Sequence, residues 1–203
     1  MKLYRRQVLG LTVAAPFALA LRPARAAARA DVSRQVLLTW HKLILELVRH
    51  TATYMPPVAA RGFAYIGIIA HEALTTGSPA LRSLAGQLTD LTPLPAREAG
   101  QFDEPCVLHA ALEMAVHELF VNTGPTGQRA MLKMAGMMGK TASDGMATEV
   151  VDRSIAHGRA VAAHILAWAA TDGGAVIENL GFPRDYTPGT RPQDWVPTSA
   201  IRM

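Results

Sequence analysis

Residues 31–50, DVSRQVLLTWHKLILELVRH, carry the pattern that decides the fold. Apolar side chains recur along this stretch at three- and four-residue spacing, and charged side chains lie mostly on the opposite side. This spacing matches the 3.6-residue period of an α-helix and predicts an amphipathic helix of about five turns with one buried face. The apolar stripe consists of Val36, Leu37, Trp40, Ile44, Leu47 and Val48.

The helical period continues through most of the remaining chain. After Pro56-Pro57 the sequence as far as Gly77 is apolar on nearly all sides, so we expect a helix over 57–77 at the centre of the fold. Further helices are predicted over residues 104–121, 125–140 and 148–170, with a short one over residues 79–88. No run of six residues alternates apolar and polar side chains. The predicted fold class is therefore all-α, a bundle of about five main helices.

The first 30 residues have the composition of an export signal. They hold six of the 20 Lys and Arg residues and none of the 16 Asp and Glu residues. The pair Arg5-Arg6 precedes an apolar run from Val8 to Leu21, and two A-x-A tripeptides follow, ending at Ala26 and Ala30. This order is typical of a bacterial twin-arginine signal with two candidate cleavage sites, and the apolar run is too short to span a membrane. The alternative, an N-terminal amphipathic helix of a cytosolic protein, does not fit the one-sided charge.

These features predict a protein exported to the bacterial periplasm or the extracellular space, with the twin-arginine export machinery as a partner. The net charge of +4 and the pI of about 9.6 at first indicate an anionic partner such as nucleic acid. Removal of residues 1–30 leaves 14 basic and 16 acidic residues, a net charge of −2, and cleavage after Ala26 leaves −1 because Arg29 remains. The basic character thus belongs to the signal, and we expect no nucleic-acid partner and no stable membrane span.

The chain divides into three predicted parts. Residues 1–30 are the signal peptide, residues 31–173 form the helical bundle, and residues 174–203 form an irregular tail rich in Pro and Gly. Because a compact domain rarely closes on such a tail, we expect it to be a connector to a C-terminal half outside this chain, or else a strap that wraps the bundle.

The densest group of polar residues in apolar surroundings offers a weak candidate for a metal site. His109, Glu113 and His117 follow one another at four-residue spacing and so share a helix face, while His71 lies on the predicted helix 57–77. Imidazoles and a carboxylate on facing helices can bind zinc or iron. The spacings H-E-x-x-H and Glu-x-x-His are both missing, however, so we expect hydrogen-bonded pairs and no metal.

Other reactive residue types lack the partners that catalysis requires. The sequence has no G-x-S-x-G motif, which leaves a hydrolase triad unsupported. A single Cys excludes an internal disulfide, and Cys106, beside Pro105 at a predicted helix start, is expected to be a small buried side chain. His157 and His164 lie seven residues apart near one face of the predicted helix 148–170, where we expect them to serve packing. The Met residues of the predicted helix 125–140 are expected to form an adaptable apolar face.

Several segments together resemble the N-terminal half of vanadium-dependent haloperoxidase-like proteins, of the phosphatidic acid phosphatase and haloperoxidase superfamily. The similar segments are the helix with Trp40, PPVAARGFAYIGIIAHEAL (56–74), NTGPTGQRAM (122–131), SIAHGRAVAAHILAWAATDGG (154–174), and NLGFPRDY (179–186) with WVPTS (195–199). The resemblance implies an all-α fold in which this part supports a later catalytic half.

The resemblance also implies an oxyanion site built from K-x6-R-P, P-S-G-H and S-R-x5-H motifs, and none of these occurs here. The nearest matches fail, because Arg184 replaces the Lys before Arg191-Pro192 and Ser33-Arg34 is one residue too far from His41. We therefore expect no catalytic residue and no cofactor in this chain, and vanadate only in a full-length relative.

Two functions remain open. The first is the N-terminal helical part of an exported haloperoxidase-like or acid-phosphatase-like protein, without a phosphate or vanadate site of its own. The alternative is a non-enzymatic periplasmic helical bundle, which binds a partner or a second copy of itself through the predicted helix 57–77 or the Met-rich helix 125–140.

Overall fold

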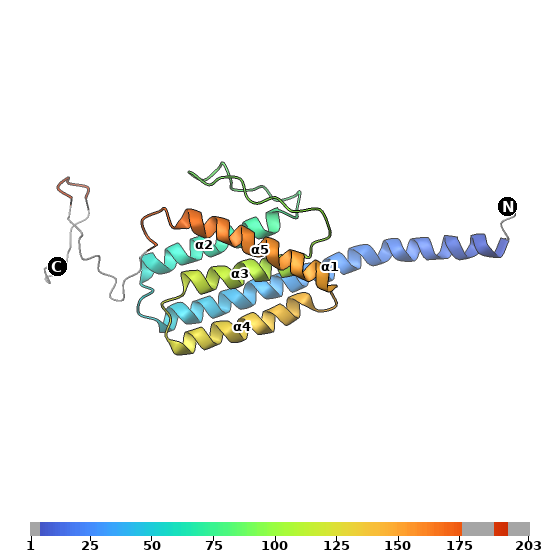
Figure 1. Ribbon diagram of the computed structural model, residues 1–203, viewed down its shortest axis with the longest axis horizontal. Coiled ribbons are helices and arrows are strands. Elements are labelled where there is room, and N and C mark those ends of the chain that lie inside the picture. Colours follow the sequence, from blue (N-terminus) through green and yellow to red (C-terminus); the bar gives the residue numbers. More distant parts are fainter. Residues whose placement is uncertain (1–4, 176–188, 195–203) are drawn as a thin grey trace.

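Five helices and their connecting loops make up the part of the chain that the computed structural model describes, residues 5–175 and 189–194, with side chains from residue 26 onward. They are α1 (Arg5–His50), α2 (Pro56–Thr75), α3 (Glu104–Leu119), α4 (Pro125–Ser143) and α5 (Thr148–Ala169), shown in Figure 1. No strand occurs among these residues. The prediction of an all-α helical bundle is confirmed.

Proline residues mark where three of the helices begin. α2, α3 and α4 each have a Pro at the first or second position, where the missing N–H has no partner to lose. At α3 the preceding Asp103 adds a cap, since its carboxylate accepts a hydrogen bond from the Cys106 N–H at 3.2 Å. The predicted helices 57–77, 104–121, 125–140 and 148–170 agree with α2 to α5 to within three residues at each end.

The prediction of a short helix over residues 79–88 is wrong. This stretch consists of turns, with Gly86 in the left-handed region at φ 75°. The Leu84 N–H donates to the Glu72 side chain at 2.6 Å and the Ser83 hydroxyl donates to the same carboxylate at 2.9 Å. Because these groups bind α2, the segment follows the surface of the bundle instead of coiling on itself.

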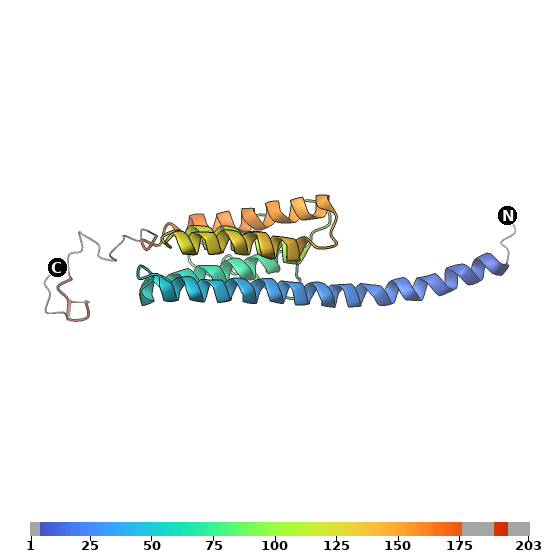
Figure 2. The same cartoon turned by 90° about the horizontal axis from the view of Figure 1, so that it is seen from below.

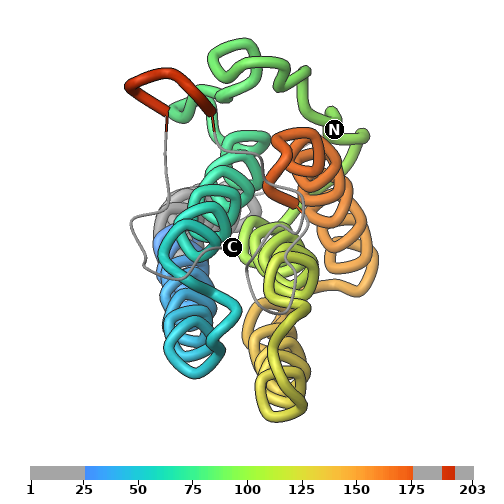
Figure 3. The backbone as a smooth tube through the Cα atoms, turned by 90° about the vertical axis from the view of Figure 1, so that its left-hand side faces the viewer, coloured from blue at the N-terminus to red at the C-terminus, as the bar shows by residue number. Residues whose placement is uncertain are grey.

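The central helix is α3, not the predicted helix 57–77. α3 contacts all four other helices, and a view along the bundle places it in the middle (Figure 3). Its small buried residues, Ala110, Ala111 and Ala115, allow neighbours to approach on several sides. On the α5 side the approach is closest at Gly158, where an added Cβ would lie 2.3 Å from the Val107 carbonyl oxygen. Residue size, and not total hydrophobicity, therefore decides which helix is central.

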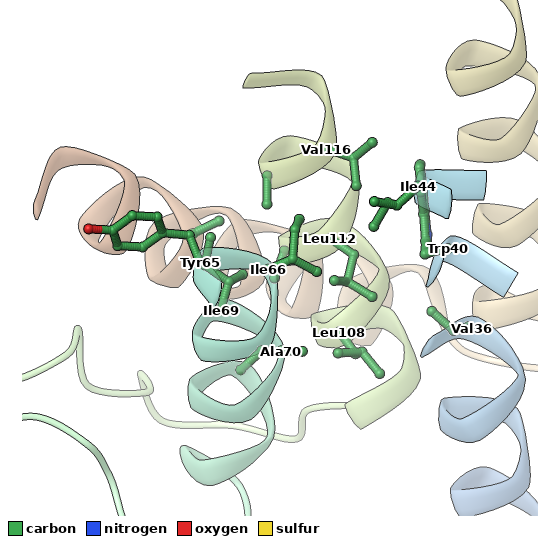
Figure 4. Packing of buried hydrophobic residues seen from close by; sticks show 14 of the residues in the cluster. Val36, Trp40, Ile44, Tyr65, Ile66, Ile69, Ala70, Leu108, Leu112 and Val116 are labelled. Atoms are coloured by element: carbon green, nitrogen blue, oxygen red, sulfur yellow. The ribbon is translucent and has the colours of Figure 1, made fainter. Parts of the chain in front are cut away.

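The core surrounds α3 and is formed by the apolar faces of all four other helices; Figure 4 shows the part between α3, α1 and α2. From the stripe predicted on residues 31–50, four residues are buried, and Leu37 and Val48 are half-buried against the core. The buried residues of this core that Figure 4 labels are Val36, Trp40, Ile44, Tyr65, Ile66, Ile69, Ala70, Leu108, Leu112 and Val116.

α1 is much longer than the other helices and extends beyond the end of the bundle (Figure 2). It continues without a break through residue 30, the predicted end of the signal, because residues 24–30 are all Ala or Arg, both strong helix formers. Within the described residues, no helix combines the length and apolar character that crossing a membrane requires. Of the predicted tail, 174–203, only residues 174–175 and 189–194 are described. Arg184 and both tail segments that resemble the haloperoxidase-like proteins, 179–186 and 195–199, lie outside the described residues.

Candidate functional site

His109, one of the weak metal candidates, is buried inside the bundle next to Trp40. The two rings stack with centroids 6.0 Å apart, and the Trp40 Nε1–H donates to His109 Nδ1 at 3.3 Å. Because Nδ1 accepts this bond, the neutral ring carries its proton on Nε2. Burial lowers the pKa of His109, and nearby Glu113 offsets this only in part. A neutral ring bonded to an indole is a packing arrangement of the core.

Glu113 lies one turn after His109 and faces outward. Its Oε2 atom is 4.0 Å from His109 Nε2 and 3.6 Å from Arg159 Nη2 on α5. His117 is half-buried a further turn along α3. The shared helix face that the spacing predicts is therefore present, and its carboxylate pairs with an arginine.

His71 does not join this group. It lies on α2, and its Nε2–H donates to the Arg82 carbonyl oxygen at 2.9 Å, in the loop that follows α2. Across all described residues, no group of three or more His, Cys, Asp or Glu side chains is arranged to hold a metal ion. The four weak candidates therefore do not form one site. His109 lies in the core, Glu113 and His117 lie on the outer side of α3, and His71 binds the loop from α2.

Cys106 is buried at the start of α3, and its thiol donates to the Ala142 carbonyl oxygen at 3.3 Å. Burial, together with the nearby Asp103 carboxylate, raises the pKa of this thiol to about 12. A thiol with this pKa is protonated at neutral pH and is a poor nucleophile. Cys106 is thus the small buried side chain that the sequence predicts.

The face of α5 that carries His157 and His164 holds the long loop between α2 and α3. His157 Nε2 lies 3.0 Å from the Thr76 hydroxyl, and His164 Nε2 lies 3.1 Å from the Thr92 hydroxyl. One turn beyond His164, the Trp168 Nε1–H donates to the Thr89 carbonyl oxygen at 3.1 Å. The two histidines do share a face, as predicted, but their role there is to bind the loop.

Two adjoining cavities of about 400 and 490 Å³ share Glu98 and Phe102 as lining residues. The first lies between the loop and α5, and the second is lined by the loop and by Thr75 at the end of α2. We call them together the loop–α5 cavity. Its lining residues are Thr75, Thr76, Gly77, Ser78, Pro79, Pro95, Ala96, Arg97, Glu98, Gly100, Phe102, Arg153, Ala156, His157 and Ala160. Compared with the cavities of about 200 Å³ beside Arg61 and about 270 Å³ beside His50, it is larger and brings together His, Arg and hydroxyl groups, so we take it as the candidate site.

Arg97 is the best-fixed cation of the loop–α5 cavity. Its Nη1 and Nη2 atoms donate to the two oxygens of Glu104 at 2.8 and 2.7 Å, and its Nε donates to the Thr76 hydroxyl at 3.3 Å. The guanidinium also lies over the Phe102 ring, 4.9 Å from its centroid. Glu104 satisfies most of the N–H donors of Arg97 and balances its charge. Arg97 therefore holds the loop in place and has few donors left for a ligand.

Of the residues that line the loop–α5 cavity, His157 and Thr76 most resemble a catalytic base and its nucleophile. Burial and the positive charge of Arg97 lower the pKa of His157, so the imidazole is neutral at neutral pH. A neutral imidazole beside a hydroxyl has the composition of a base and a nucleophile. The Thr76 hydroxyl, however, donates to the Ala73 carbonyl oxygen at 3.0 Å and accepts from Arg97. With its proton directed to Ala73, Thr76 accepts from the His157 N–H, and the pair acts as a structural bond.

Nothing in the local spacing of Thr76, Arg97 or Phe102 marks them as residues of a site. Arg97 lies in a stretch rich in Pro and Gly, and its partner Glu104 belongs to the next helix. The available signal was the sequence Asp103-Glu104-Pro105, which indicates a helix start where an acidic side chain meets free N–H groups.

Comparison with known proteins adds no relative. A scan against protein-family models found no match to this chain, and searches of the curated proteins and of the solved structures found none either.

Proposed function

We propose that this chain is an exported protein and that its bundle is the N-terminal, supporting part of a haloperoxidase-like or acid-phosphatase-like protein. One observation carries the export proposal: α1 extends beyond the bundle, and the extended part holds the twin arginines and the apolar run (Figure 2). A leader that lies outside the packed domain is accessible to the export machinery while the domain stays folded. The proposed partner is the twin-arginine translocase, and the proposed location is the periplasm or the extracellular space.

The supporting role follows from the chemistry of the loop–α5 cavity. A phosphate or vanadate site requires several N–H donors that converge on one anion. In this cavity Arg97 is paired with Glu104, Arg153 donates to the Gln101 carbonyl oxygen at 3.0 Å, and the carboxylate of Glu98 lines both parts. These residues do not fit an oxyanion, and we assign vanadate chemistry only to a full-length relative.

An export experiment tests the first half of the proposal. Expressed in a bacterial host, the full chain is expected in the periplasmic fraction, and Arg5→Lys with Arg6→Lys is expected to keep it in the cytoplasm. The double variant preserves the charge, and Lys2→Arg is a matched control that changes one basic residue outside the pair. Equal export of all three proteins would contradict a twin-arginine route.

An activity assay tests the second half. The purified chain is expected neither to hydrolyse p-nitrophenyl phosphate nor to oxidise halide with vanadate and peroxide. Activity of the chain that is lost in His157→Ala or Arg97→Ala would overturn the supporting role and locate an active site in the loop–α5 cavity.

One observation favours the alternative of an interaction protein. The Met-rich helix α4 buries Met131 and Met138 but exposes Leu132 and Met137, with 65% and 46% of their surfaces accessible. Contiguous exposed apolar patches mark contact surfaces, and Leu132 and Met137 are the side chains of α4 from which such a patch would be built. Light scattering tests this alternative: a wild-type dimer that becomes a monomer in Leu132→Glu would support it, and a wild-type monomer would count against self-association.

A further inference from the structure

We propose that the signal is removed after Ala26 and that Arg29 is the first residue of the folded domain. The sequence offers two A-x-A sites, and Arg29 lies between them, after Ala26 and before Ala30. The proposal rests on the proposed export of the chain, and it selects one of the two sites from the contacts that Arg29 makes.

Arg29 is bound to two other parts of the bundle. Its Nε donates to Asp103 Oδ2 at 2.8 Å, and its Nη2 donates both to Asp103 Oδ1 and to the Ala142 carbonyl oxygen. Only 20% of the Arg29 side chain and 5% of the Asp103 side chain remain accessible. Such a shielded, two-pronged ion pair is strong compared with a surface pair.

The two partners of Arg29 lie at helix ends that need hydrogen bonds. Asp103 caps the start of α3, and Ala142 lies in the last turn of α4, where the carbonyl groups have no partner within the helix. Arg29 therefore joins α1 to the first turn of α3 and the last turn of α4. Ala26, Ala27 and Ala28 are exposed, as are Ala30 and Asp31, so the burial and bonds of Arg29 are what distinguish the second site from the first.

Cleavage requires the chain to leave the helix locally. A signal peptidase adds water across one peptide bond, which leaves a carboxylate on the residue before the bond and an ammonium group on the residue after it. The residues next to that bond must be open and extended in the protease, so a site held by tertiary contacts is cut slowly.

The cleavage sites after Ala26 and Ala30 differ in the contacts that must break before the protease can bind the chain. A cut after Ala30 places Arg29 second before the bond, so its bonds to Asp103 and Ala142 must break, and Val32, which packs against the core, must shift as well. A cut after Ala26 opens exposed alanines and leaves Arg29 three residues beyond the bond. The fold thereby protects the second site.

Trypsin measures this protection without any need for export, because it cuts after arginine and both Arg25 and Arg29 are present. In the folded full chain we expect cleavage after Arg25 to be at least about tenfold faster than cleavage after Arg29, since cleavage after Arg29 requires its bonds to Asp103 and Ala142 to open. Mass spectrometry of the products gives both rates. Equal rates would overturn the proposal.

Asp103→Asn is the matched variant for this measurement. It leaves the leader sequence untouched and keeps a side chain that caps helices about as well as Asp, but it removes the charge that holds Arg29. We expect faster cleavage after Arg29 in this variant, with circular dichroism showing the same helix content. An unchanged rate in a folded variant would contradict the role of the ion pair.

Purified signal peptidase then tests the choice of site. We expect the full chain to be cut after Ala26, and Ala24→Leu, which spoils the first A-x-A tripeptide, to leave the precursor uncut. Adding Asp103→Asn to Ala24→Leu is expected to permit a cut after Ala30. Rapid cleavage after Ala30 in the single variant would overturn the proposal, whereas cytoplasmic retention of the chain in cells would overturn only its export.

Discussion

α1 contains two segments that share one backbone conformation and differ in what stabilises it. From Arg29 to His50 the helix packs against α3 and α4, and Val36, Trp40, Ile44 and Leu47 are buried there. Before Ala26 the helix extends beyond the bundle (Figure 2), and Pro16 and Pro23 each lack the N–H that a helix interior requires. Helical conformation alone therefore does not show that a segment belongs to the domain; the contacts of the segment do.

The largest effect is expected at Trp40, in the segment from Arg29 to His50, which we call the domain segment; the part before Ala26 is the extended segment. Its ring is fully buried and its N–H bonds to His109, so Trp40→Ala should lower the free energy of unfolding by about 3–5 kcal/mol. Leu38→Ala, on the exposed side of the same helix, should change it by no more than about 0.5 kcal/mol. Urea denaturation of both variants measures the difference. Similar losses would contradict the assignment of the buried face.

The next effect locates the boundary between the segments. A chain that begins at Ala27 should unfold with the same free energy as the full chain, whereas a chain that begins at Asp31 lacks Arg29 and should lose about 2–3 kcal/mol, because a shielded carboxylate remains unpaired. Thermal unfolding of the two truncated proteins tests this. If both were as stable as the full chain, Arg29 would contribute nothing to the fold.

A smaller effect is expected from protonation of His109, which packs on the domain segment of α1. Burial lowers its pKa below 6.5 in the folded state, so the unfolded chain binds protons more readily. Stability should be complete above that value and should fall as the pH drops below it. His157, whose pKa burial also lowers, acts in the same direction. Urea denaturation from about pH 7.5 to about pH 5.5 should show this slope, and His109→Gln should reduce it.

The smallest effect is expected when glycine takes the place of alanine, once in each segment of α1. Gln35→Gly, at an exposed position of the domain segment, should cost about 1 kcal/mol of unfolding free energy relative to Gln35→Ala, because glycine is a poor helix former. Ala20→Gly, in the extended segment, should leave the midpoint of urea denaturation unchanged. A measurable loss in Ala20→Gly would show that the extended segment unfolds together with the bundle.

The sequence was sufficient to predict the helices and insufficient to predict the loop. The stripe that includes Trp40 and the prolines at the start of α2, α3 and α4 act over a few residues, and most helix bounds follow from them, although the start of α1 at Arg5 does not. The contacts of the 76–103 loop join distant residues, such as Thr76 with His157 and Thr92 with His164, which lie 81 and 72 positions apart. Helical periodicity relates only residues within about one turn, so it contains no information on such pairs.

The same limit explains why the sequence does not predict the burial of His109 or the point on α1 where the folded domain begins. The sequence placed His109 and Glu113 correctly on one helix face, but the burial of His109 depends on Trp40, 69 positions away. The predicted signal, residues 1–30, includes Arg29, whose partner Asp103 lies 74 positions further on. The central place of α3 depends on how closely its small residues let other helices approach, and a hydrophobic pattern does not measure size.

The attachment of the 76–103 loop also sets an order of events during synthesis. Glu72 and His71 on α2 already bind residues 82–84 of the loop. His157, His164 and Trp168, which bind it at Thr76, Thr92 and Thr89, belong to α5, which the ribosome makes after the other four helices. At about 5–20 residues per second the loop waits for several seconds before its binding face exists. The loop–α5 cavity is therefore the last part of the bundle to form on a nascent chain, and a chain halted before α5 would carry the loop exposed to chaperones and proteases.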